Sequence, residues 1–313
     1  MQDFINALPG AASQGLIWGI MAIGVYLTYK ILDIADLTVD GSFCTGAAVF
    51  VMLFSAGWNI WLAMLLAAAA GMLAGLVTGL LHTLCGIPAI LAGILTQLGL
   101  WSVNLAVMAM KANVSINVID AKTLDKLMVS LRFVQDVAKG SRPFWRHPIF
   151  VVGIFTLVLI ALLYWFFGTE LGCALRATGS NGSMARAQGI NTNFGKVLGL
   201  MLSNGLVALS GALLAQYQSY ADINMGRGAI VIGLASVIIG EVLFSRIFRN
   251  FGLKLFAVSI GAVIYYIVIQ AVLSMGLNSN YLKLLSAAVV ALFLSVPYWK
   301  NRYFAKPVKK GAN

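Results

Sequence analysis

Long apolar runs alternate with short polar segments along almost the whole chain. A helix that crosses the hydrocarbon core of a membrane needs about 20 predominantly apolar residues. Polar, Gly or Pro positions within 36–48 and 86–100 are typical of broken or re-entrant helices, so the number of spans is predicted as eight to ten. The runs predict spans at 12–32, 38–56, 60–82, 88–110, 148–168, 195–218, 228–245, 253–275 and 281–299.

The composition agrees with a membrane protein. Of the 313 residues, 60% are hydrophobic and 10% are charged, whereas a soluble domain carries about 25% charged residues. The mean hydropathy is +0.91. We therefore predict an all-α, polytopic transmembrane helical bundle, a single transmembrane domain over 1–313, with no separate soluble domain.

The basic residues predict the orientation of the chain. The net charge is +11, but it lies in loops rather than on one folded basic face, which favours contacts with membrane lipids and argues against nucleic acid as a partner. Lys and Arg concentrate on the cytoplasmic side of membrane proteins. The basic tail 300–313 is therefore predicted to be cytoplasmic, and parity places the segment 169–194 on the same side.

The segment 111–147 is predicted to be an extracytoplasmic loop, although its many Lys and Arg residues run against the positive-inside rule. Its apolar residues recur at helical spacing between charged ones. This pattern predicts an amphipathic helix that either rests on the membrane surface or contacts a partner. The apolar positions are Leu124, Leu127, Met128, Leu131 and Val134.

The chain carries no pattern typical of an enzyme or of a metal site. The two histidines, His82 and His147, are far apart, and neither HExxH, GxSxG nor a phosphate-binding loop is present. The three cysteines form no CxxC pair, which argues against a disulfide or a bound metal. We therefore expect neither catalysis nor a bound cofactor.

The polar residues within the apolar runs are few. An ion-coupled carrier needs ionisable groups at mid-membrane, and the span centres are nearly free of charge. Glu241 is the exception, and Arg246 close behind it predicts an ion pair at the interface. Neutral residues such as Asn204 are expected to bond helix to helix, and a glycine stripe is expected to allow close helix packing. The stripe consists of Gly71, Gly75 and Gly79.

Two segments carry more polar character than a connection needs. The stretch 31–49, "ILDIADLTVDGSFCTGAAV", places acidic residues at the entry to a span, where the helix dipole favours them. The stretch 170–191, "ELGCALRATGSNGSMARAQGIN", contains a predicted short helix that Ser180 or Asn181 caps and Gly189 ends. Its small and adaptable side chains suit docking into a groove on another protein.

Both segments resemble motifs of one family. The second is similar to the cytoplasmic coupling segment of ATP-binding-cassette (ABC) importer permeases of the branched-chain amino-acid and monosaccharide group. "DLTVDGS" (36–42) resembles a motif at an early span of the sugar permeases, with Asp40 as an addition to that pattern. The matching positions of the coupling segment are Gly172, Arg176, Ala177, Gly179, Asn181, Ala185, Gly189 and Ile190.

The resemblance implies an importer permease of a bacterial cell membrane. It implies separate ABC ATPase subunits that hold ATP and Mg, an extracytoplasmic substrate-binding protein, and a second permease subunit, expected to be a second copy. Among the group, permeases linked to tryptophan- or tyrosine-type binding proteins resemble the chain most, so we expect a small polar solute, an amino acid with aromatic ones favoured. The alternatives are a monosaccharide or nucleoside, or an ion-coupled secondary transporter.

The same resemblance implies two groups of functional residues. The expected ATPase-coupling residues are Arg176, Gly179, Asn181, Met184, Ala185, Arg186 and Gly189. The possible solute pathway at the early span comprises Asp36, Thr38, Asp40 and Ser42.

Overall fold

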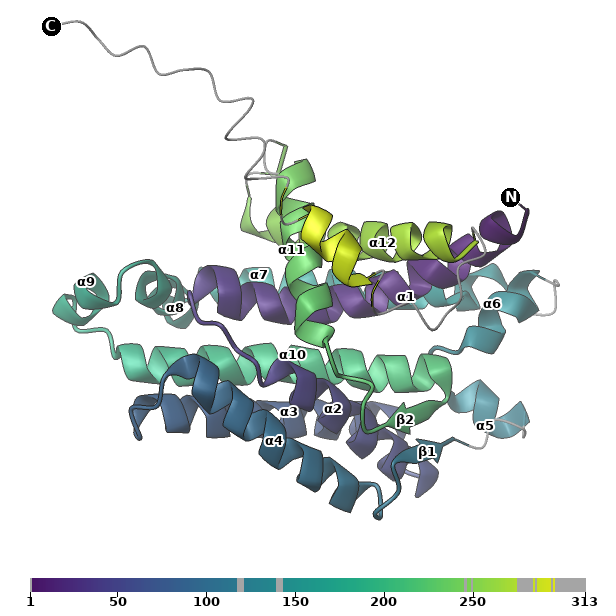
Figure 1. Cartoon of the computed structure of the whole chain (residues 1–313), viewed down its shortest axis with the longest axis horizontal. Helices are drawn as coiled ribbons and strands as arrows, with labels where there is room; N and C mark the ends of the chain where they lie inside the picture. The colour runs from purple at the N-terminus through teal and green to yellow at the C-terminus, as the bar shows by residue number, and fades with distance from the viewer. Residues whose placement is uncertain are drawn as a thin grey trace, which may run out of the picture.

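Apolar helices form the body of the protein (Figure 1). The computed structural model describes residues 2–116, 121–138, 143–244, 247–248, 250–274, 284, 286–293 and 295. The long elements are α1 (Gln2–Tyr26), the π-helical turn η1 (Leu27–Ile31), α2 (Val39–Ser55), α3 (Ile60–Thr83), α4 (Ala89–Val107), α7 (Pro148–Gly168), α10 (Thr192–Gln218), α11 (Ala229–Phe244) and α12 (Phe251–Ser274). The smaller ones are β1 (Asn113–Ser115), α5 (Ala121–Lys126), α6 (Leu131–Ala138), η2 (Phe144–Arg146), α8 (Glu170–Ser180), α9 (Gly182–Ala187) and β2 (Tyr220–Asp222).

These helices confirm the predicted fold class. Among the described residues, six helices are long and apolar enough to cross a membrane, and α2 and α11 are shorter apolar helices. Together they coincide with eight of the nine predicted spans. The ninth, 281–299, is described only in part, at 284, 286–293 and 295, and the tail 300–313 lies outside the described residues. The chain is a polytopic helical membrane protein.

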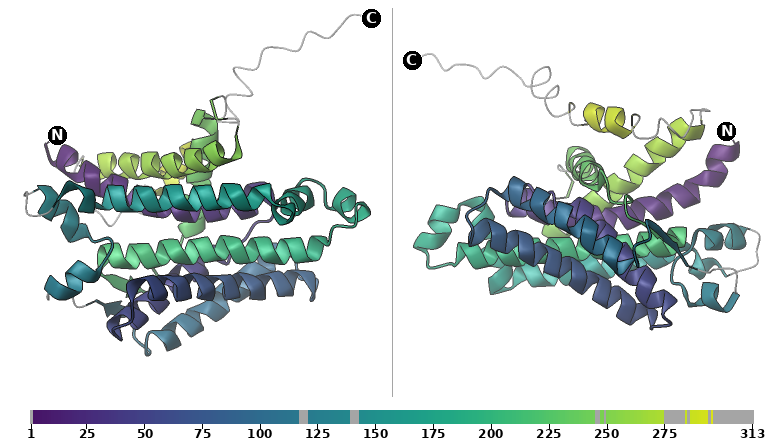
Figure 2. Two further views of the ribbon diagram at one scale, coloured as in Figure 1. Left: turned by 180° about the vertical axis from the view of Figure 1, so that it is seen from behind. Right: turned by 60° about the horizontal axis from the view of Figure 1, so that its bottom comes forward.

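The two most buried spans, α1 and α10, lie at the centre of the bundle. Helix α10 packs against α3, α2 and α1, and α1 packs in turn against α12 and α11. Figures 1 and 2 show α8 and α9 projecting at one end of the bundle, which we call the α9 end. The antiparallel pair β1–β2, with α5 and α6, lies at the opposite end, which we call the β end. The N-terminus lies at the β end.

Helices α2 and α11 begin inside the bundle rather than at its ends. Ser42, in the first turn of α2, bonds to Asn204, which lies midway along α10. The carboxylate of Asp40 accepts hydrogen bonds from Gly228 N and Ile230 N at the start of α11. The 16 residues of α11 are about 24 Å long, less than the hydrocarbon thickness of about 30 Å. The break predicted within 36–48 thus precedes Val39.

The break predicted within 86–100 lies only at the start of that range. Helix α4 is continuous from Ala89 to Val107, and the interruption lies just before it, between the end of α3 and Pro88. Proline has a fixed φ and no N–H, so it suits the start of a helix. Pro88 accordingly precedes the first residue of α4.

The glycine stripe of α3 packs closely against another helix, as predicted, and the structure identifies that helix as α10. A side chain at Gly71 would overlap the carbonyl oxygen of Asn204, and one at Gly75 would overlap that of Leu200. Gly79 lies against Val197 in the same way, where a Cβ would stand 3.0 Å from the Val197 Cα. The absence of side chains lets the two backbones approach closely, which is how membrane helices gain packing energy in lipid.

We expect Gly75→Val to destabilise the bundle strongly. The new Cβ would lie 2.7 Å from the carbonyl carbon of Leu200, and overpacking of this kind costs about 1–3 kcal/mol, or more when backbone must move. The measurement is the unfolding of the purified chain in mixed micelles. Gly153→Val is the matched control, because its Cβ would meet only Leu16 Cδ1 at 4.0 Å. Equal losses for both variants would contradict close α3–α10 packing.

The predicted amphipathic helix in 111–147 is divided between α5 and α6. Helix α5 closes with a bond from Leu127 N to Leu124 O. Ser130 then begins a new helix, since its hydroxyl accepts a hydrogen bond from Arg132 N at 3.3 Å. Leu124 and Leu127 are buried, whereas in α6 Phe133 is buried and Leu131 is 48% exposed. The local cap at Ser130 overrides the continuous apolar spacing.

Candidate coupling segment and solute pathway

Helix α9 is the predicted short helix. Asn181 is its N-cap, and the Asn181 Oδ1 accepts hydrogen bonds from Met184 N at 3.0 Å and from Ser183 Oγ at 2.7 Å. Gly189 follows the helix with a φ of +82°, a left-handed conformation that suits glycine. Ala185 is fully buried and anchors the helix, whereas the neighbouring Met184 is 51% exposed. The result is a small capped peg with an apolar tip.

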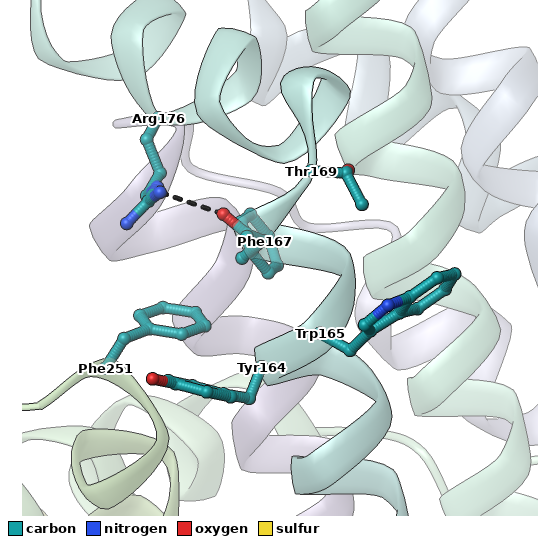
Figure 3. A pocket seen from close by; sticks show the side chains of 7 residues that line it. Tyr164, Trp165, Phe167, Thr169, Arg176 and Phe251 are labelled. Atoms are coloured by element: carbon teal, nitrogen blue, oxygen red, sulfur yellow. Dashed lines mark hydrogen bonds between the residues drawn. The ribbon is translucent and has the colours of Figure 1, made fainter.

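Helix α8 connects this peg to the spans. Gly179 lies directly against the backbone of Ile31 in η1, where any side chain would overlap the Ile31 carbonyl oxygen. Arg176 attaches α8 to the end of α7, because its Nη2 donates to the carbonyl oxygen of Phe167 at 2.8 Å (Figure 3). Thr169, between α7 and α8, caps α8 by accepting from Gly172 N. Helix α8 therefore joins α9 to the ends of α1 and α7.

Glu241 forms an ion pair with Lys30, a partner that the sequence did not indicate. The Lys30 Nζ lies 3.2 Å from the Glu241 carboxylate, and this bond joins η1 to the end of α11. Arg246 lies outside the described residues. Both side chains of the observed pair are partly exposed, so we expect it to contribute about 0–1 kcal/mol.

A buried polar cluster lies at the point where α2 begins. Asp36 Oδ2 accepts a hydrogen bond from Asn204 Nδ2 at 2.7 Å, and Ser42 Oγ donates to Asn204 Oδ1 at 2.6 Å. The hydroxyls of Thr38 and Thr78 are 2.7 Å apart, and that of Thr78 donates to Thr96. Asp36, Thr38, Ser42 and Asn204 are all buried. The cluster joins α2, α3, α4 and α10, and it confirms that Asn204 bonds helix to helix.

Asp40 lies apart from this cluster, at a cavity of about 220 Å³. Its two carboxylate oxygens face the backbone N–H groups of Gly228 and Ile230, both at 2.9 Å. The side chain of Arg227 lines the same cavity and makes no hydrogen bond or ion pair within the described part of the chain. Asn104 is 1% exposed, and its Oδ1 has no hydrogen-bond partner among the residues that the structure describes. The cavity is lined by Asp40, Gly41, Cys44, Gln97, Leu98, Trp101, Asn104, Ile223 and Arg227.

The predicted site residues thus lie in three places. The seven residues of the coupling segment are gathered at the α9 end. Three residues of the early motif are buried around Asn204, and Asp40 alone faces a cavity. Trp101 and Arg227 were not predicted, because each looks like an ordinary residue of a span or a loop until the fold brings it to Asp40. No group of three or more potential metal ligands occurs among the residues searched, which are the described ones.

Comparisons with known proteins find transport permeases that are similar to the chain. A family model described as "Branched-chain amino acid transport system / permease component" matches residues 8–294. The tyrosine transport system permease protein of Clostridioides difficile is 39% identical over 291 residues, which cover 93% of this chain and 91% of that protein. The autoinducer 2 import system permease protein of Salmonella typhimurium is 26% identical over 76% of this chain and 63% of its own length.

One solved structure shares the fold. The chain aligns with a chain of the structure of PsaBC from Streptococcus pneumoniae in complex with Fab, with a TM-score of 0.56, 18% identity, and coverage of 97% of this chain and 98% of that one. An identity this low supports the arrangement of the helices and nothing more.

Proposed function

The chain belongs to the family of branched-chain amino acid transport system permease components, and from that premise we propose that it carries an amino acid, with aromatic ones favoured, across a bacterial cell membrane. It is a multi-pass permease component of an ABC transport system, a transport subunit and not an enzyme. The single observation that carries the substrate class is the 39% identity to a tyrosine transport permease. A monosaccharide or nucleoside is the alternative.

The solute pathway is proposed to pass the cavity beside Asp40. An amino acid carries an ammonium and a carboxylate group, and this cavity presents the Asp40 carboxylate and the guanidinium of Arg227. Trp101 adds an aromatic face, which suits stacking with an aromatic side chain. The buried Asp36, Thr38 and Ser42 serve the pathway indirectly, since they fix the start of α2 and therefore the position of Asp40.

The driving force is proposed to come from separate ABC ATPase subunits that bind ATP and Mg. The exposed tip of α9 and its rigid connection to α1 and α7 support this role for the coupling residues, from Arg176 to Gly189. The α9 end and the C-terminus are then cytoplasmic. An extracytoplasmic binding protein would deliver the solute to the β end.

A second copy of the chain is proposed to complete the pathway. Helix α4 carries a row of large, exposed apolar side chains at helical spacing, namely Leu91, Leu95, Leu98 and Trp101. Two of them, Leu98 and Trp101, also line the cavity beside Asp40. A second copy against this row would enclose the cavity between two α4 helices.

The experiment is uptake by vesicles that contain the permease, its ATPase and its binding protein. We expect accumulation of labelled tyrosine that requires ATP. Permease alone, driven by an ion gradient, should accumulate nothing. The buried Asp36 is the kind of group that a proton-coupled carrier uses, so gradient-driven accumulation by the permease alone would overturn the proposal.

The same vesicles test the pathway. We expect Arg227→Gln to lower ATP-driven uptake about 10-fold, which corresponds to about 1.4 kcal/mol, because the solute carboxylate loses a charged partner. Lys111→Gln, another exposed cation near the β end, is the matched control and should leave uptake unchanged. Full uptake by Arg227→Gln would contradict this pathway without contradicting the ATP requirement.

A further inference from the structure

Two adjoining cavities at the α9 end lie outside the proposed solute pathway. The first, of about 550 Å³, is lined by Lys30, Arg176 and Lys254, with Tyr26, Gly179 and Phe251 among its other residues. The second, of about 460 Å³, is lined chiefly by aromatic side chains, among them Tyr164, Trp165 and Phe167 (Figure 3). Arg176 and Phe251 line both cavities. The first, which we call the basic cavity, therefore adjoins the second, which we call the aromatic cavity.

The basic cavity carries an excess of positive charge. Lys30 is paired with Glu241 at 3.2 Å, whereas Lys254 has no ion-pair partner among the residues that the structure describes. Arg176 donates from Nη2 to Phe167 O and to Cys173 Sγ, and a guanidinium has further N–H groups to offer. Three cations against one carboxylate leave two positive charges, so the cavity favours an anion.

The aromatic cavity indicates where the two cavities lie relative to the membrane surface. Tyr164 and Trp165 are 57% and 71% exposed near the end of the apolar helix α7. Exposed Trp and Tyr residues gather where hydrocarbon meets the headgroups of a membrane. Figure 3 shows the rings of Tyr164 and Phe251 close to each other below Arg176. The basic cavity therefore lies at the level of the lipid headgroups, with an apolar crevice beside it.

We propose that these cavities bind an anionic phospholipid. Its phosphate lies among Lys30, Arg176 and Lys254, and the upper part of one acyl chain lies along Tyr164, Trp165 and Phe251. Basic pockets between transmembrane helices are suited to anionic headgroups. An acidic loop of a soluble partner could meet the charges but would leave the aromatic crevice empty, so the combination favours a lipid. The bound lipid would join η1, α7, α8 and α12.

The test is lipid binding by the full chain in nanodiscs of phosphatidylcholine with increasing phosphatidylglycerol, with retained lipids counted by native mass spectrometry. Each cation at a membrane surface strengthens anionic lipid binding about five-fold. We therefore expect Lys254→Gln to weaken phosphatidylglycerol retention about five-fold. Lys111→Gln, at the β end, is the matched control and should retain the lipid as the unmodified chain does.

A second pair of variants tests the aromatic half without changing any charge. Trp165→Ala should weaken phosphatidylglycerol retention, and Trp145→Ala should not, although Trp145 is as exposed, at 74%. The melting temperature in pure phosphatidylcholine shows that each variant is folded. The proposed lipid site would be wrong if Lys254→Gln retained phosphatidylglycerol as the unmodified chain does, or if Lys111→Gln lowered that retention as much as Lys254→Gln.

Two further outcomes would also overturn it. Displacement of the lipid by glycerol phosphate at similar concentration would show that the headgroup alone is recognised and that the aromatic crevice has no part. Loss of ATPase co-purification from Lys254→Gln, with lipid retention unchanged, would assign the basic cavity to the ATPase instead. None of these readouts depends on the identity of the transported solute.

Discussion

Replacing Met184 by glutamate is expected to reduce ATP-driven uptake at least about 30-fold, because a buried hot-spot side chain contributes about 2 kcal/mol or more to an interface. Met184 is 51% exposed at the tip of α9 and is held there by the Asn181 cap. A carboxylate at this position would have to be desolvated in the groove of the ATPase. The measurements are uptake by reconstituted vesicles and the amount of ATPase that co-purifies.

The matched control is Met184→Leu, which keeps the apolar tip and should retain both uptake and the ATPase. Because Met184 is exposed, neither variant should change the melting temperature of the permease itself. Ala185→Pro tests the same peg from within, since it removes the bond from Ala185 N to Asn181 O. Full uptake with bound ATPase in both Met184→Glu and Ala185→Pro would show that α9 is not the coupling element.

Replacing Asn204 by leucine is expected to destabilise the bundle by at least about 2 kcal/mol, because two buried polar groups each lose a hydrogen-bond partner, at about 1–3 kcal/mol apiece. The change removes the donor to Asp36 Oδ2 at 2.7 Å and the acceptor of Ser42 Oγ at 2.6 Å. Bulk water cannot reach the interior of a membrane bundle to replace these bonds. The measurement is unfolding by sodium dodecyl sulfate in mixed micelles.

Thr156→Val provides the comparison for this loss. Thr156 is also buried, but its one hydrogen bond among the described residues stays within its own helix, to Val152 O at 2.8 Å. Its removal should cost about 1 kcal/mol or less. A similar loss for Asn204→Leu would mean that the bonds across helices contribute no more than a local one, and the polar cluster would then not hold the start of α2.

The parts of the fold that depend on local sequence could be predicted. Apolar runs of sufficient length gave the positions of eight spans, because hydropathy alone decides which segments enter a membrane. Asn181 and Gly189 gave the bounds of α9, because capping depends on residues within one turn. The glycine stripe of α3 gave a packing face, since its period of four matches the helix. Each of these predictions depends on residues within one short segment of the chain.

Contacts between distant segments could not be predicted from one sequence. Asn204 was expected to bond another helix, but nothing in its surroundings named Asp36, 168 residues away. Lys30 and Glu241 are 211 residues apart, and the nearby Arg246 was the more obvious partner. The cavity beside Asp40 could not be predicted from the sequence for the same reason, because its lining residues come from α2, α4 and the segment before α11.

The late start of α2 inside the bundle has a consequence for how the protein is made. Asp36, just before α2, bonds to Asn204 of α10, so Asp36 leaves the ribosome 168 residues before this partner. At 5–20 residues per second, this interval is roughly 10–30 s. During that time the Asp36 carboxyl lacks its bond to Asn204. We therefore expect Asp36 to stay near the insertion machinery until α10 is made, and pauses in translation before α10 to lower the yield of folded protein.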